Sequence, residues 1–205
     1  MPSPGPRRPK GLPHGPEEVR RSVLDAASAL FGARGVAQVT LRDIAAEAKV
    51  NLGLISRYVG TRDELVRAVF DDLTSQLLDE MDEHPTASRG FDPDSVMVRW
   101  NLVLTYLVIT DAPDAIAIGG AITDRLRSVI EESYDASPDS ARLRAAQIMA
   151  AAIGWRLFEP FLIASAGLEH LPIDQVRTEL TRSNRRLGAT PFPSPPDPQA
   201  RDATA

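Results

Sequence analysis

The sequence predicts an all-α protein of about nine helices, with a small N-terminal domain of three helices followed by a larger helical body. Between residues 17 and 187, apolar residues recur at spacings of three and four, the period of an amphipathic helix. No stretch shows the sustained apolar–polar alternation of a strand. Glycines and prolines fall between the periodic stretches, where they begin or end helices.

The same pattern divides the chain into four segments. Residues 1–16 contain six prolines and three glycines, and we expect a disordered basic arm there. Residues 17–64 are the predicted N-terminal domain, and residues 65–187 are the predicted body. Residues 188–205 are again rich in proline and have little to pack, so we expect a disordered tail.

The N-terminal helices have clear start and stop signals. Gly35 ends the first helix. Thr40 is a good N-cap for a short second helix, and Asp43 three residues later resembles a capping box. A third short helix follows at about 51–59, and Thr61 begins a fourth that runs to about residue 83.

The body is predicted to contain five more helices. Prolines stand at or just before the starts of three of them, where a missing backbone N–H costs nothing. We expect these helices at about 94–110, 113–118, 121–134, 139–166 and 173–187.

Composition excludes several kinds of site. The chain has no cysteine, which excludes disulfides, thiolate metal sites and cysteine nucleophiles, and its three histidines are far apart. We therefore predict no metal and no other cofactor. Common catalytic and phosphate-loop motifs are absent from the sequence, so we do not expect an enzyme. The longest apolar stretches fall short of the ~20 residues of a membrane helix, which favours a soluble cytoplasmic protein with no membrane contact.

The net charge of −5 is unevenly distributed. Residues 1–70 carry 11 Lys/Arg and 7 Asp/Glu, a net of +4, whereas residues 71–205 carry 12 and 21, a net of −9. A basic head on an acidic body suits a DNA-reading domain joined to a body that stays away from phosphates. Chance segregation of charge is the alternative explanation.

Residues 40–59 carry the functional prediction. Two short helices joined by a turn bury little alone, so they must pack on each other and on the first helix. The outer face of the third helix is then free, and it fits a major groove about 12 Å wide. The alternative is an ordinary hairpin in some other all-α protein. The basic arm either lies along a DNA groove or is a solvated terminus.

The stretch from Val23 to Val69 resembles the DNA-binding domain of the TetR family almost from end to end. The resemblance rests on LDAA…LF…RG at 24–35, TLRDIA at 40–45, the V-x-x-G-x-I pattern at 50–55 and YVGTRDEL at 58–65. It implies a helix-turn-helix that binds double-stranded operator DNA, and a helical body that forms a homodimer and holds a small-molecule effector.

Carried over by position, the resemblance implies roles for eight residues. Thr40 presents a helix N-terminus to a phosphate, and Arg42 reads a guanine edge. At the start of the recognition helix, Asn51 reads an adenine edge, Leu52 touches a thymine methyl, and Gly53 lets the backbone come close. Arg57 and Tyr58 contact a phosphate or a base, and Arg62 contacts a phosphate.

Three positions depart from the family pattern. Ser56 stands where the family usually has a phosphate-binding tyrosine, and Leu52 replaces a frequent lysine. Lys49 occupies a turn position usually given to glycine. If the backbone there is left-handed, the side chain is held at a cost of roughly 1–2 kcal/mol.

The helix predicted at 139–166 is apolar nearly all round, so it must be covered on both sides. One side faces its own domain and the other implies a partner; a core helix in a monomer is the alternative. The last helix has a narrower apolar stripe, and two helices from each subunit suit a four-helix interface. The predicted interface residues are Ile148, Ala152, Trp155, Leu162, Val176 and Leu180.

A mixed set of aromatic, methionine and polar residues in the body is the predicted effector pocket. Each is alternatively a plain core residue. The set carries no formal charge, which favours a mainly apolar ligand that releases the protein from its operator. The alternatives are a regulator that binds a partner protein, or an activator. The pocket residues are Met97, Trp100, Asn101, Tyr106, Tyr134, Met149 and Phe158. Arg156 and Glu159 are expected to pair along one helix.

Overall fold

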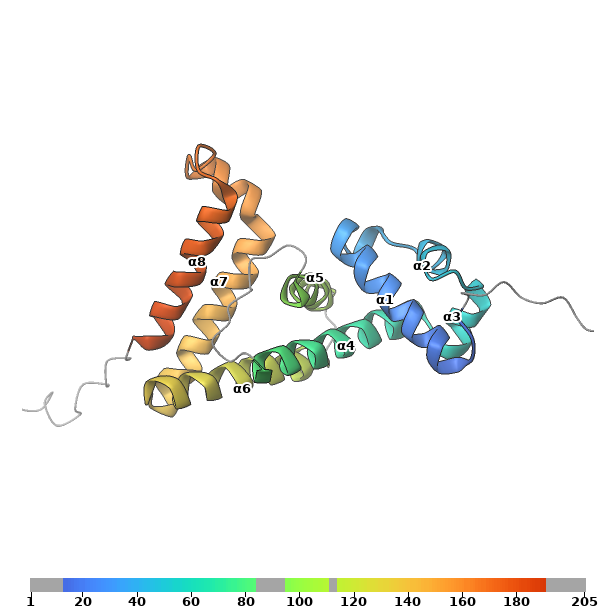
Figure 1. Cartoon of the computed structure of the whole chain (residues 1–205), viewed down its shortest axis with the longest axis horizontal. Helices are drawn as coiled ribbons and strands as arrows, with labels where there is room; N and C mark the ends of the chain where they lie inside the picture. Colours follow the sequence, from blue (N-terminus) through green and yellow to red (C-terminus); the bar gives the residue numbers. More distant parts are fainter. Residues whose placement is uncertain (1–12, 84–94, 111–113, 191–205) are drawn as a thin grey trace, which may run out of the picture.

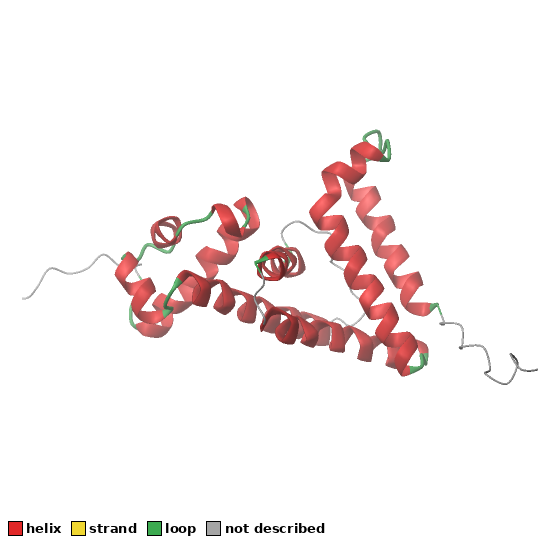
Figure 2. Cartoon of the chain, turned by 180° about the vertical axis from the view of Figure 1, so that it is seen from behind, coloured by secondary structure: helices red, strands yellow, loops and turns green. Residues whose placement is uncertain are grey.

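The computed structural model describes residues 13–83, 95–110 and 114–190, with side chains from 120 onward in the last segment. Within these residues the fold is entirely helical, with eight α-helices, one 3-10 turn and no strand (Figure 2). The all-α prediction is confirmed. The predicted arm lies mostly outside the described residues, which begin at residue 13. Its last residue, Pro16, is the first residue of α1.

The helices follow the sequence signals closely. The N-terminal part contains α1 (Pro16–Arg34), η1 (Val36–Gln38), α2 (Leu41–Glu47) and α3 (Leu52–Tyr58). The rest consists of α4 (Arg62–Glu83), α5 (Val96–Ile109), α6 (Asp114–Tyr134), α7 (Pro138–Ser165) and α8 (Ile173–Ala189).

Two boundary predictions were wrong. Separate helices were expected at 113–118 and 121–134, but α6 runs through both, including Gly119 and Gly120. Each helical glycine costs about 1 kcal/mol relative to alanine, and the packing of α6 on α4 and α7 outweighs that cost. The tail was expected from residue 188, but Gly188 is a buried residue of α8. A Cβ on Gly188 would lie 3.4 Å from a ring carbon of Tyr134, so only a small residue fits easily.

The helices form an elongated molecule with the N-terminal helices at one end. In Figure 1, α1, α2 and α3 lie at the right, while α7 and α8 form an antiparallel pair at the left. The helices α4 and α6 pack together along the base, and α5 lies between the two ends. Since α5 contacts α1 and η1 as well as α4, α6 and α7, it joins the N-terminal helices to the body.

One continuous apolar core runs from α1 to α7. It includes Val23 and Phe31 of α1, Ile55 of α3 and Phe70 of α4. The ring of Phe70 stacks on that of Trp100 in α5, with centroids 5.5 Å apart. The N-terminal helices therefore share one core with the body, to which α4 contributes, and a second, smaller cluster lies between α6 and α7.

The α7 helix differs from the others in how little of it is covered. It is long and apolar enough to cross a membrane by length and composition alone, and 11% of its most apolar window is buried within the chain. A single helix of this kind is weak evidence for a membrane, because a helix at a protein interface has the same composition.

Candidate nucleic-acid interface

Two capping boxes fix the starts of α2 and α4. The Thr40 hydroxyl accepts a hydrogen bond from the Asp43 amide, and the Asp43 carboxylate accepts one from the Thr40 amide at 2.8 Å. Glu64 and Thr61 make the same reciprocal pair. The bonds from Thr40 lower the pKa of Asp43, and the backbone amide of Thr61 lowers that of Glu64. Both starts were predicted from the sequence.

The turn between α2 and α3 has the left-handed residue that the sequence raised as a question. Lys49 has a φ of 54°. Its amide donates to the Ala46 carbonyl and the next amide, Val50, donates to Ala45. These two bonds are those of a Schellman motif, in which the left-handed position usually belongs to glycine. The turn therefore holds a lysine against its backbone preference.

The recognition helix α3 is held by α1 and leaves its other faces exposed. Ile55 is the buried side chain of α3 and reaches the common core. Two α1 side chains reach backbone carbonyls of the motif: Ser22 Oγ donates to Ala48 at 3.1 Å, and Arg20 Nη1 donates to Tyr58 at 3.4 Å. Sequence reasoning missed these two supports, because no local signal links residues 26 and 38 positions apart.

Most predicted DNA-contact residues lie exposed on α2 and α3, while Tyr58 is half-buried against the core. The Arg57 guanidinium lies 5.4 Å from the centroid of the Tyr58 ring, which orients its charge on the outer face. The Asn51 Oδ1 accepts a bond from the Gly53 amide, so the free group of that side chain is its NH₂. The exposed residues are Thr40, Arg42, Asn51, Leu52, Gly53 and Arg57.

Arg62, predicted as a phosphate contact, makes hydrogen bonds within the chain. Its guanidinium donates to the carbonyl oxygens of Val39 at 2.5 Å and Val36 at 2.6 Å. It thereby ties the start of α4 to the segment just before α2. These two bonds give Arg62 a structural role, and its contact with a phosphate stays a prediction.

The residues predicted to line the effector pocket do not form one group. Trp100 is fully buried, and its indole N–H donates to the Thr74 hydroxyl at 2.9 Å, as a core residue would. Tyr134 is 43% exposed and Phe158 is 57% exposed, so they belong to other surfaces. Four residues do lie at or against the buried body: Met97, Asn101, Tyr106 and Met149.

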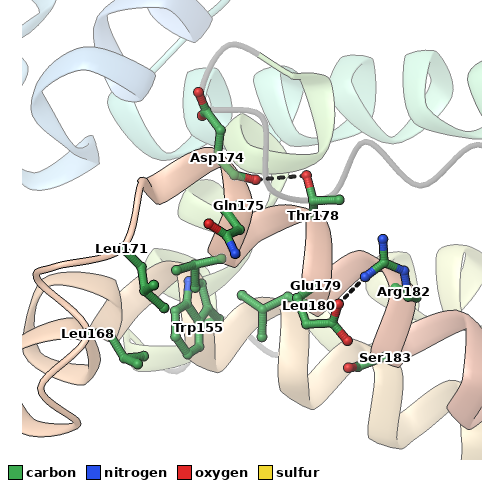
Figure 3. A pocket seen from close by; sticks show the side chains of 11 residues that line it. Trp155, Leu168, Leu171, Asp174, Gln175, Thr178, Glu179, Leu180, Arg182 and Ser183 are labelled. Carbon is green, nitrogen blue, oxygen red and sulfur yellow. Dashed lines mark hydrogen bonds and ion pairs between the residues drawn. The ribbon is translucent and has the colours of Figure 1, made fainter.

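The predicted dimer residues are divided between the chain's interior and a groove. Ala152 and Val176 are buried within the chain, while Ile148 packs against the cluster between α6 and α7. Trp155 and Leu180 line a groove of about 700 Å³ between the end of α7 and α8. Figure 3 shows Trp155 beside Leu168 and Leu171, with the Glu179–Arg182 pair further along α8.

The most exposed apolar residues of α7 form a stripe that sequence reasoning did not separate from the rest of the helix. Its members recur at helical spacing. Leu162, which was predicted at the dimer interface, is half-buried. The sequence signal was present, because an all-round apolar helix contains such a stripe, but only packing shows which side is left uncovered. We call Leu143, Leu157, Phe158 and Phe161 the α7 stripe.

The expected pairing of Arg156 with Glu159 is replaced by a contact with α8. Both carboxylate oxygens of Glu159 accept bonds from Arg177, at 2.7 and 3.2 Å, and one also accepts the Trp155 indole N–H at 3.0 Å. Burial tends to raise the pKa of Glu159, but the bonds from Arg177 and Trp155 outweigh it and lower the pKa. No group of metal-ligating side chains occurs in the described parts of the chain.

Comparison with known proteins agrees with the helix-turn-helix geometry. Residues 23–69 match the family model for bacterial regulatory proteins of the tetR family. The chain is 35% identical over 185 residues to the HTH-type transcriptional repressor Rv3405c of Mycobacterium tuberculosis, covering 86% of this chain and 92% of that protein. It is 27% identical over 128 residues to the HTH-type transcriptional regulator TtgR of Pseudomonas putida, covering 62% and 56%.

Solved structures show the same fold. A transcriptional regulator from Rhodococcus sp. Rha1 superimposes with a TM-score of 0.59 at 18% identity, covering 82% of this chain and 95% of that one. The multidrug binding protein EbrR complexed with ethidium gives 0.55 at 22% identity, covering 85% and 99%. Together with the helix-turn-helix described above, these comparisons show that the chain belongs to the TetR family of transcriptional regulators, which bind operator DNA and act as dimers.

Proposed function

We propose that this protein is a homodimeric, cytoplasmic repressor that a small, mainly apolar ligand releases from its operator. The observation that carries the proposal is the outer side of α2 and α3. These short helices are fixed by caps and by α1, while Arg42 and Arg57 point away from the core into solvent. A rigid helix with an exposed basic face is what reading a major groove requires.

Repression is supported by a relative, since Rv3405c is named a transcriptional repressor and matches most of this chain. Ligand release is supported by EbrR, a multidrug binding protein of the same fold solved with ethidium. The packing of α5 on both α1 and α7 gives a ligand in the body a route to the DNA-binding helices. A ligand shifts DNA binding only if it prefers one arrangement of those helices.

The α7 stripe and the adjacent groove support a homodimer. Phe158 and Phe161 are 57% and 67% exposed, which is unusual for neighbouring aromatic side chains on a single chain in water. A second copy related by a two-fold axis brings the same stripe and groove to the interface, so each subunit covers the other. Ala150 and Gly154 on α7 allow the helices to approach closely.

The DNA part is tested by a mobility-shift assay on the region upstream of the protein's own gene. We expect a specific complex with a near-palindromic site whose half-sites lie about one helical turn apart or more. Binding no tighter than to a shuffled sequence would contradict the proposal.

The dimer is tested by light scattering at micromolar concentration. The wild type should give about twice the chain mass of 22.2 kDa, and Phe161→Glu should give a folded monomer that loses operator binding. Glu132→Lys, an exposed change on α6 outside the stripe and the groove, is the control and should remain dimeric. A wild-type monomer would contradict the dimer.

A further inference from the structure

Asn101 and Thr105 on α5 have buried polar atoms without a hydrogen-bond partner among the described residues, as does the Nε of Arg99 on another face of the helix. Asn101 is 1% exposed, and neither its Oδ1 nor its Nδ2 has a hydrogen-bond partner among the described residues. Thr105 is half-buried, and its Oγ1 is also enclosed and unpaired there. More than nine in ten buried polar groups in proteins are paired. Asn101 and Thr105 therefore require an explanation.

Trp100 and Thr110 show that neighbouring polar groups do find partners. The Trp100 indole N–H is bonded to Thr74 at 2.9 Å, and the Thr110 hydroxyl donates to the Tyr106 carbonyl at 2.8 Å. A threonine in a helix can return its hydroxyl hydrogen to the carbonyl four residues before, as Thr110 does. Thr105 does not do so.

Asn101 and Thr105 lie on one face of α5. They are four residues apart, so their side chains stand one above the other along the helix. The stripe that packs into the main core is a different one, formed by Val96, Trp100, Val103 and Leu107. The face of Asn101 and Thr105 is a different one, and it is also covered, because Asn101 and Val98 are each 1% exposed and Met97 packs against the core.

A buried amide and a buried hydroxyl without partners destabilise the folded protein, because each has lost its hydrogen bonds to water. That cost is recovered when a molecule supplies the missing donor and acceptor. The other residues on this face, Met97, Val98 and Val108, carry no formal charge. A bound ion would lack a counter-charge on this face, so a neutral group fits better.

We propose that Asn101 and Thr105 bind the neutral carboxamide-like head of a small apolar effector. The asparagine side chain presents an acceptor beside a donor, which matches the N–H and C=O of an amide or lactam. The Thr105 hydroxyl supplies a third hydrogen bond to the same head. This inference rests on the proposed function, because it assigns chemistry to the effector site of a ligand-released regulator.

The test is calorimetric titration of the full-length protein with benzamide, benzoate and toluene, which share a ring and differ in the head group. Benzamide should bind the wild type, with benzoate and toluene weaker by about tenfold or more, as expected when a hydrogen-bonding site meets a ligand that cannot pair with it. Asn101→Leu and Thr105→Val should weaken benzamide binding by about tenfold. Thr110→Val is the control on the same helix and should bind benzamide normally.

A melting measurement in the absence of ligand separates a ligand site from a structural one. Replacing an unpaired buried amide by an apolar group of similar size removes a penalty, so Asn101→Leu should melt at the same temperature as the wild type or higher. Thr74→Val, which removes a paired hydroxyl, should melt lower. If Asn101→Leu also melts lower, the amide has a structural partner such as an ordered water, and the proposal is overturned.

Other results also decide the matter. Benzamide that fails to bind, that binds Asn101→Leu as well as wild type, or that binds more weakly than benzoate overturns the assignment. Asn101-dependent binding that leaves operator affinity unchanged supports the site and refutes ligand release as the proposed function. A molecule that releases operator equally from wild type and Asn101→Leu supports release and overturns the site.

Discussion

The Arg99 side chain of α5 lies across Gly32 of α1, with its Cγ 3.1 Å from the place a Cβ would occupy on the glycine. This is tighter than most Cβ contacts in proteins, so a methyl group there requires the arginine stem or its helix to shift by a few tenths of an ångström. The contact is one of those by which the body touches the DNA-binding helices. Glycine at position 32 therefore sets how closely α5 approaches α1.

We predict that Gly32→Ala weakens operator binding several-fold while leaving the protein folded. The added methyl displaces α5 from α1 by a few tenths of an ångström, and helix propensity changes by at most about 1 kcal/mol in favour of alanine. Fluorescence anisotropy with labelled operator measures the affinity. Arg99→Ala in the same chain should restore binding, because it makes room for the methyl. Unchanged affinity of Gly32→Ala would show that this contact does not set the helix spacing.

Lys49→Gly should raise the melting temperature. A left-handed φ of 54° costs a non-glycine residue roughly 1–2 kcal/mol, and the Lys49 side chain is exposed. The net gain should be near 1 kcal/mol, since glycine also gives the unfolded chain more freedom. Asp135→Gly at φ 49° is a matched control in the body and should act in the same direction. A fall of several degrees would show that the lysine stem or charge stabilises the turn.

Arg62→Ala should mainly lower the free energy of unfolding, and any effect on DNA binding should be secondary. Its removal leaves the Val36 and Val39 carbonyls without their charged donor, at a cost of about 1–3 kcal/mol. Chemical denaturation measures this loss. Arg57→Ala, which removes an exposed guanidinium, should leave the unfolding free energy nearly unchanged. Equal stability of the two variants would contradict the structural role of Arg62 and favour a phosphate contact.

Arg42→Ala and Arg57→Ala should differ in what they do to DNA recognition. Arg57→Ala should weaken all sequences about equally and reduce the slope of log affinity against log salt by about 1, if it contacts a phosphate. Arg42→Ala should relax the preference at one base pair by roughly 1–3 kcal/mol, if it reads a guanine. Binding to a set of single-base operator variants at two salt concentrations measures both effects. The same profile for both variants would contradict this division.

The capping carboxylates predict an acid-sensitive DNA-binding motif. The pKa values of Asp43 and Glu64 are lowered in the folded protein by the bonds from Thr40 and Thr61. Their contribution to stability is present above their unfolded pKa values and is lost as the pH falls through the folded ones. The melting temperature should therefore fall when the pH drops below about 4.5, the ordinary pKa of a glutamate. In Asp43→Asn together with Glu64→Gln, the drop should be smaller; an identical drop would place the acid sensitivity elsewhere.

The sequence alone determined the features that depend on neighbours within about four residues. The helix starts at Thr40 and Thr61 are of this kind and occur as predicted. The turn at Lys49, which the sequence marked as a position usually given to glycine, is left-handed. The all-α class also followed directly, since the apolar period is a property of each segment by itself. Gly119 and Gly120 show the limit of such reasoning, because packing on α4 and α7 keeps α6 continuous across them.

Tertiary structure alone decided which side of each helix is covered and where each charged group finds its partner. Arg62 bonds to carbonyls 23 and 26 residues away, and Glu159 bonds to Arg177 across 18 residues. Such pairs depend on helix placement, which no local pattern encodes. For the same reason, the sequence placed Asn101 and Phe158 in one predicted pocket. The fold buries the Asn101 amide without a partner and leaves the Phe158 ring exposed. An apolar period shows that a helix has a face to bury, but only the packing of the other helices determines what covers it.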